Sequence, residues 1–185
     1  AWHVRVLSVE QLARTWWSNL ATSRRLANKF VKWGSENGWL EVRDAISRKP
    51  EPLLQPITTW HPDEPVPDFA ELSRFLHRRA RTPARKFRVV IASRKCRELF
   101  GFGGAAHRPK LTQLSHELYV SEVFIRYLKN GMDPTSLVWT GEDDFPPEWP
   151  LRVRPDGLIC DEEGNFLRAI EYGGAYSVRR LSGLY

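Results

Sequence analysis

The first 43 residues carry two helical apolar patterns separated by a short polar turn, and this arrangement limits the fold most strongly. In the first pattern Val9, Leu12 and Trp16 recur at the spacing of one helix face, which predicts a helix over 7–17. Ser8 stands where its hydroxyl can accept a hydrogen bond from the first helical turn, so we expect it to cap this helix. Two such helices joined by a sharp turn are typical of a helix-turn-helix unit.

The second helical pattern covers 24–37 and follows a polar turn at 18–23, in which Thr22 or Ser23 can cap the helix. Gly38 can take the left-handed conformation that ends a helix. The apolar positions at helical spacing are Leu26, Phe30 and Trp33. We expect this stripe to be buried, with polar side chains on the remaining faces.

A hairpin is predicted after the second helix, with strands at 39–43 and 57–60 around a Pro-rich, charged connection. Two helices, a sharp turn and this hairpin together predict an N-terminal winged helix-turn-helix. The rest of the first half is predicted as a loop at 61–68, a helix at 68–81, a strand at 86–92 and a short helix at 93–101.

The two parts of the chain differ in charge. Residues 1–110 hold 21 Lys and Arg against 10 Asp and Glu, whereas residues 111–185 hold 7 against 12. The basic part favours double-stranded DNA, because a recognition helix enters the major groove with donors on its solvent face. The candidate DNA contacts are Arg24, Arg25, Asn28, Lys29 and Lys32 on the second helix, Arg43, Arg48 and Lys49 in the wing, and Arg78 and Arg79 in a later basic run. A small helical domain with an ordinary charged surface is the alternative interpretation.

A Gly-rich stretch at 101–109 marks a boundary, so we expect a DNA-binding domain over 1–103 and a second domain over 104–185. The second domain is predicted as a helix at 111–131, strands at 136–144, 151–161 and 166–173, and a helix that starts at 177. The fold class is therefore α+β, with a winged helix-turn-helix followed by a small α/β core. The chain ends soon after the last helix begins, which suggests that this core is truncated at its C-terminus.

Two acids stand on neighbouring strands of the second domain. In a hairpin centred on the turn at 162–165, Asp156 and Glu171 are equally far from the turn and face each other. Like charges at this distance repel, and one Mg²⁺ that accepts an oxygen from each acid would offset the repulsion. A metal held in this way can activate water for attack on a phosphodiester. Asp156 and Glu171 are therefore candidate metal ligands and catalytic residues, and Glu117 on the preceding helix could join them.

This half resembles the PD-(D/E)XK nuclease-like core in the motifs "RPDG" (154–157) and "AIEYG" (169–173) and in its strand order. Active members of that superfamily place a Lys two residues after the second acid, and Gly173 stands there. Arg179 or Arg180 could substitute from the next helix, but an Arg keeps its proton and cannot act as a base. The resemblance therefore favours the scaffold of a nuclease without its cleavage activity.

The chain as a whole resembles the replication-relaxation family of plasmids and other mobile elements. The matching stretches are "LSVEQLARTWW", "RRLANKFVKWGSENGWL", "LSHELYVSEVFIRYL", "RPDGLI" and "IEYGGAYSVRRLSGLY", together with the step His116-Glu117-Leu118 and the spacing of Glu171 and Gly174. Members resemble a winged helix joined to a degenerate nuclease-like half. The resemblance implies a DNA-binding protein that acts in the replication, transfer or maintenance of a mobile element, with an inactive nuclease-like half.

Two other functions fit the same residues. The chain could be an Mg²⁺-dependent DNA endonuclease or nickase that uses Asp156 and Glu171, or a winged-helix transcriptional repressor whose acidic half dimerises or senses a ligand. Besides DNA, we expect a second copy or a partner replication or transfer protein. Cys96 and Cys160 form no zinc or disulfide motif, and no apolar run is long enough for a membrane span, so we expect a cytoplasmic location.

Overall fold

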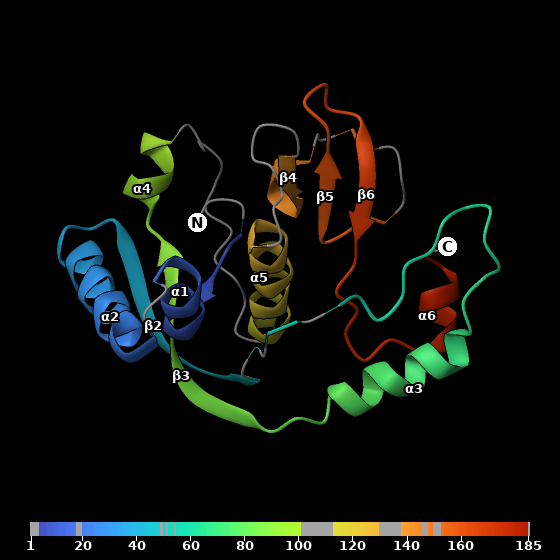
Figure 1. Ribbon diagram of the computed structural model, residues 1–185, viewed down its shortest axis with the longest axis horizontal. Helices are drawn as coiled ribbons and strands as arrows, with labels where there is room; N and C mark the ends of the chain where they lie inside the picture. The colour runs from blue at the N-terminus through green and yellow to red at the C-terminus, as the bar shows by residue number, and fades with distance from the viewer. Residues whose placement is uncertain are drawn as a thin grey trace.

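Two antiparallel sheets and a central helix form the framework of this α+β protein (Figure 1). The computed structural model describes residues 4–17, 20–48, 50, 52–53, 55–100, 113–129, 138–145, 148–149 and 153–184. The strands of the first sheet are, in spatial order, β1 (Leu7–Ser8), β3 (Ala84–Ala92) and β2 (Leu40–Arg48), and those of the second are β4 (Val138–Gly141), β5 (Gly157–Cys160) and β6 (Phe166–Ile170). Helix α5 (Leu114–Lys129) lies between the two sheets.

Helix α1 (Val9–Trp16) begins where the sequence predicts, because Ser8 caps it. The Ser8 hydroxyl accepts a hydrogen bond from the Gln11 backbone N–H at 3.1 Å, and the Gln11 side chain accepts one from the Ser8 N–H at 2.9 Å. This reciprocal pair is a capping box, which satisfies two donors at the start of the helix. The first predicted helix is confirmed.

Helix α2 (Leu20–Glu36) starts earlier than the sequence predicts. Residues 20–23 belong to the helix, so the prediction of a polar turn there is wrong and neither Thr22 nor Ser23 is a cap. Leu and Ala favour the helical conformation, which extends the helix past the two hydroxyl side chains. Gly38 follows the helix end with a φ of 72°, the left-handed conformation expected of it.

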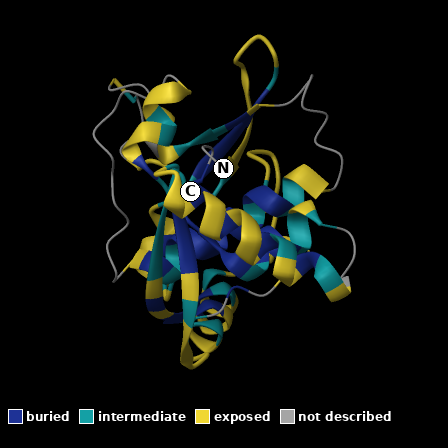
Figure 2. Cartoon of the chain, turned by 90° about the vertical axis from the view of Figure 1, so that its left-hand side faces the viewer, coloured by how far each residue is buried: buried dark blue, intermediate teal, exposed yellow. Residues whose placement is uncertain are grey.

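The buried side of α2 also differs from the predicted one. The residues of α2 that the structure describes as buried are Ser23, Ala27, Val31 and Gly34. Phe30 and Trp33 are instead 42% and 54% exposed. Small side chains let α2 approach the first sheet closely, since a Cβ on Gly34 would lie 2.5 Å from Leu40 Cδ1. The predicted burial of the aromatic stripe is therefore wrong, and Figure 2 shows how buried and exposed residues divide along the helices.

The partner of β2 is β3, with which it pairs antiparallel along its whole length. The predicted strand at 57–60 is not a strand, because prolines stand on both sides of it and cannot donate to a ladder. Helix α3 (Phe69–Arg79) lies in the long connection between β2 and β3 and is capped by Asp68. Helix α4 (Arg94–Leu99) follows β3 and is capped by Ser93. Both short helices agree with the predictions.

The second half has the predicted order of helix, strands and helix, and it ends with α6 (Val178–Ser182). Its strands are shorter than predicted. The strand β5 starts after Pro155, which has no N–H for a ladder. A 3₁₀ turn, η2 (Glu142–Asp144), follows β4, and the turn at 162–165 joins β5 to β6 as expected.

One hydrophobic cluster takes residues from both predicted domains. It contains Val31 of α2 and Val90 of β3 together with Phe124 of α5, Trp139 of β4 and Ile159 of β5. The division after residue 103 stays a prediction, and its linker at 101–109 lies outside the described residues. Within the described ranges, no helix is both long and apolar enough to cross a membrane.

Candidate functional site

The polar residues predicted to contact DNA from the second helix lie together on one face of α2. Arg24, Arg25, Asn28, Lys29 and Lys32 are all exposed. At 3.6 residues per turn they occupy about 140° of the helix circumference, in a sector beside the one that holds Ala27, Val31 and Gly34. The sequence spacing and the packing of α2 therefore agree on where these side chains project.

Most charges on this face are not neutralised by neighbouring residues. Lys32 forms an ion pair with Glu36 at 3.8 Å, and both side chains are largely exposed. Arg24, Arg25 and Lys29 form no ion pair with any residue that the structure describes. The face thus presents positive charge to solvent.

The remaining predicted DNA contacts are spread over β2 and α3. Arg43 pairs with Glu41 on the same strand at 2.9 Å. Arg48 donates from Nε to a backbone carbonyl in the turn before β3 at 3.2 Å. Arg78 is exposed in the last turn of α3, and Lys49 lies outside the described residues.

The β5–β6 hairpin brings Asp156 and Glu171 to the same end of the second sheet. Gly157 lies opposite Ile170 in the ladder, and the Asp156 N–H donates to the Ile170 carbonyl at 2.9 Å. The predicted pairing of Asp156 with Glu171 is therefore the next position after the last observed pair of the ladder, Gly157 and Ile170. Partial desolvation of the carboxyl group and the negative charge of Asp156 raise the pKa of Glu171 above its ordinary value, although the residue as a whole is exposed.

Both carboxylate oxygens of Asp156 are engaged. Oδ1 lies 2.7 Å from His116 Nε2, and Oδ2 accepts a hydrogen bond from the Tyr172 N–H at 2.7 Å. Burial opposes a charged imidazole, but the hydrogen bond to Asp156 and the neighbouring carboxylates outweigh it and raise the pKa of His116. When His116 is protonated, it is the counter-charge of Asp156.

Glu171 is engaged by the segment that follows β6. Its Oε1 accepts a hydrogen bond from the Tyr176 hydroxyl at 2.6 Å, and Arg180 Nη2 donates to the same hydroxyl at 3.2 Å. Burial and the Glu171 carboxylate raise the pKa of Tyr176, so the phenol keeps its proton and acts as a donor. We call the set His116, Asp156, Glu171, Tyr176 and Arg180 the polar cluster.

Glu117 contacts a different group. Its Oε1 accepts a hydrogen bond from Arg5 Nη1 at 2.9 Å, and the same nitrogen of Arg5 lies 3.2 Å from Glu142. Burial raises the pKa of Glu117, and the charge of Arg5 opposes this effect. The structure thus brings Asp156 and Glu171 together with His116, while Glu117 binds Arg5.

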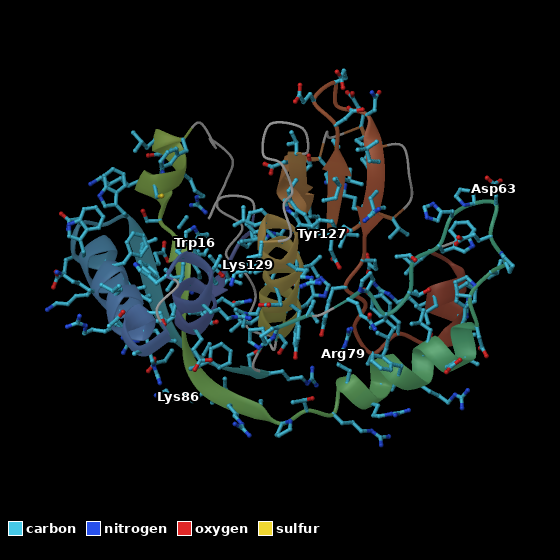
Figure 3. The ribbon with its side chains drawn as sticks, in the orientation of Figure 1. Trp16, Asp63, Arg79, Lys86, Tyr127 and Lys129 are labelled. Atoms are coloured by element: carbon cyan, nitrogen blue, oxygen red, sulfur yellow. The ribbon has the colours of Figure 1, made fainter. Side chains whose placement is uncertain are left out.

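Arg79 points from α3 towards the segment after β6 (Figure 3). Its guanidinium lies 4.0 Å from the centroid of the Tyr172 ring and donates to the carbonyls of Tyr172, at 2.8 Å, and of Gly173. Gly173 has a φ of 63°, and a Cβ there would lie 3.4 Å from Leu76. The backbone of a Lys at position 173 would be strained at this φ, which is a local reason for the glycine.

The contacts of His116, Tyr176 and Arg79 within the protein were not predicted from the sequence, which predicts Arg79 as a DNA contact, whereas the structure places it on Tyr172 and Gly173. His116 and Asp156 are 40 residues apart, and Arg79 and Tyr172 are 93 apart, so no local pattern links them. In the sequence, His116 stands out among these three residues because it belongs to the step His116-Glu117-Leu118, which is part of the family resemblance. Tyr176 has no signal that distinguishes it from a packing residue.

Among the residues that the structure describes, no three His, Cys, Asp or Glu side chains are arranged to hold a metal ion. Comparisons of the chain with protein-family models, with curated proteins and with solved structures find no match.

Proposed function

We propose that this protein binds double-stranded DNA through α2 and acts in the replication, transfer or maintenance of a mobile element. The exposed face of α2 carries the proposal, because it aligns cationic and amide donors along one side of a helix that a major groove can accept. The proposed role in a mobile element rests on the resemblance to the replication-relaxation family.

The elements around α2 support a winged helix-turn-helix. Helix α1 precedes α2, and the long β2–β3 ribbon follows it, as a wing follows a recognition helix. On β3 the exposed residues Arg85, Lys86 and Arg88 add positive charge, of which Lys86 pairs with Asp44 at 3.1 Å. Cationic groups there suit phosphate contacts, which position a protein on DNA without reading its sequence.

The polar cluster supports a role for the second half other than cleavage. Asp156 and Glu171 are bound by His116, Tyr172 and Tyr176. Gly173, where nuclease-like cores carry the Lys, has a backbone conformation unsuited to a Lys. These contacts stabilise the end of the second sheet, and in our proposal this half is a scaffold.

The test of DNA binding begins with selection of a preferred duplex from a random pool. Fluorescence anisotropy then compares the native protein with the variant Arg24→Ala/Arg25→Ala on that duplex. We expect the variant to lose about 1–3 kcal/mol for each lost base contact. The control, Arg168→Ala, changes an exposed arginine on β6 and should leave affinity unchanged. Equal affinity of the double variant and the native protein would refute α2 as the recognition helix.

A metal-dependent endonuclease is the second candidate. One observation favours it: Asp156 and Glu171 lie at the same end of the β5–β6 ladder, next to the pair Gly157 and Ile170. Incubation of supercoiled plasmid with the protein and Mg²⁺ or Mn²⁺ tests this function. Nicking that disappears in Asp156→Ala would support it, and absence of nicking in the native protein would count against it.

A further inference from the structure

An aromatic stripe on α2 is exposed beside the cationic face. Phe30 is 42% and Trp33 is 54% exposed, and Leu26 on the same stripe is half-buried. The ring of Phe30 lies beside that of Trp17, with ring centroids 6.2 Å apart. Apolar residues at this helical spacing usually face a core, but the interior side of α2 is formed by smaller residues.

Exposure of this stripe to water is unfavourable in free energy, and a bound ligand would cover it. Large apolar side chains gain free energy when they leave water, and Trp and Phe have the most apolar surface to bury. Grouped exposed apolar residues on a protein surface mark binding sites more often than single ones do. The stripe is therefore a candidate contact surface, and the neighbouring charges indicate its ligand.

Cations border the stripe. Lys29 and Trp33 are four residues apart on the helix, so their side chains are neighbours, and Lys29 and Lys32 each precede an aromatic residue in the chain. Just past the helix end, the backbone N–H of Trp39 donates to the Gly34 carbonyl at 2.8 Å, and Lys95 Nζ lies 4.1 Å from the centroid of the Trp39 ring. A ligand that is both anionic and flat fits this combination.

We infer that the stripe of Phe30 and Trp33 binds unpaired bases, so that α2 recognises duplex DNA that continues into a single strand. Bases stack on aromatic rings, and flanking cations hold the phosphates of the strand. The duplex face and the stripe lie on adjacent sides of one helix, which lets one DNA molecule contact both. This inference rests on the proposed function and specifies its substrate.

The experiment measures anisotropy with two labelled DNAs: the preferred duplex, and the same duplex with a single-stranded thymine tail of about 10 nucleotides. The native protein should bind the tailed DNA about tenfold more tightly. The variant Phe30→Leu/Trp33→Leu keeps apolar side chains but removes the rings, so it should lose the gain from the tail and keep its affinity for the duplex. Trp33→Phe retains a ring and should keep part of the gain.

The matched control is Phe166→Leu, which removes an aromatic ring that is 60% exposed on β6, in the acidic half. It should leave both affinities unchanged. Circular dichroism and thermal unfolding of each variant establish that it is folded, and Trp33→Leu alone replaces the double variant if the latter unfolds.

The outcomes separate the two proposals. No binding to the duplex would refute the proposed function. Binding to the duplex without a gain from the tail, or a gain that survives Phe30→Leu/Trp33→Leu, would refute this inference alone. A dimer seen by light scattering without DNA, and abolished by Trp33→Leu, would assign the stripe to a second copy of the chain and would also overturn it.

Discussion

Helices α2 and α5 use charged residues in opposite ways. On α2 the cationic residues are exposed, and Arg24, Arg25 and Lys29 have no ion-pair partner among the described residues. On α5 the residues His116, Glu117 and Glu122 are partly or fully buried, and each contacts a group from a distant part of the chain. Those partners are Asp156 for His116, Arg5 for Glu117 and Arg14 for Glu122.

The difference follows from where each helix lies. Helix α5 is enclosed between two sheets, so an ionised side chain there must find a partner or lose its hydration without compensation. Helix α2 lies at the edge of the molecule, where water solvates its charges. Charges on α5 therefore hold the fold together, whereas charges on α2 are available for a ligand.

The largest effect is expected from Arg14→Ala. Arg14 Nη1 donates to Glu122 Oε1 at 2.9 Å, and the Glu122 side chain is only 3% exposed. Without Arg14 a buried carboxylate loses its counter-charge, so the free energy of unfolding should fall by about 3–5 kcal/mol. Urea unfolding followed by circular dichroism measures this change. Arg25→Ala on α2 should change it by less than about 0.5 kcal/mol, and similar losses in both variants would break the comparison.

A smaller loss of stability is expected from Asp156→Ala. The Asp156 side chain is 12% exposed and binds both His116 and the Tyr172 N–H. Its removal leaves these donors without an acceptor, which should cost about 1–3 kcal/mol in the same urea experiment. Glu162→Ala, in the exposed turn between β5 and β6, is the control. A neutral effect of Asp156→Ala would mean that the polar cluster does not support the fold.

The salt dependence of DNA binding should change with Lys29→Ala/Lys32→Ala. If each Lys contacts one phosphate, the slope of log affinity against log salt should become shallower by about 0.9 for each Lys removed. Titrations of the preferred duplex at several salt concentrations measure the slope, and Arg168→Ala should leave it unchanged. An unaltered slope in the Lys variant would show that this part of the α2 face does not meet phosphates.

The smallest effect is expected from pH. The pKa of His116 in the folded protein is raised above its ordinary value, near 6.5, so the folded state holds this proton more tightly than the unfolded state does. The stability from the His116–Asp156 pair is therefore complete below about pH 6.5 and is lost as pH rises through the raised pKa. Urea midpoints between roughly pH 6 and pH 9 measure this loss. His116→Gln should reduce the slope, and an unchanged slope would contradict the assignment.

Much of the local structure follows from short stretches of sequence. Ser8 caps its helix as expected, Asp68 and Ser93 cap theirs in the same way, and Gly38 takes the left-handed conformation after α2. The β5–β6 register follows from the tight turn, because a hairpin turn fixes which residues face each other. Each of these features depends on side chains within a few residues of the backbone that they organise.

The tertiary structure decided the features that depend on distant residues. The strand that pairs with β2 is β3 and not the segment 57–60. Both segments have apolar residues typical of a strand, so their patterns do not show which one pairs with β2. Which side of α2 is buried depends on the surface that receives it, and close approach to Leu40 favours Gly34 over Trp33. The contact between His116 and Asp156 also joins residues that are 40 positions apart in the chain. The sequence by itself determined where α1, α3 and α4 begin, where α2 ends and how the hairpin is aligned, because those energies are local. The start of α2, the strand partners and the buried faces were decided by packing between segments far apart in the chain.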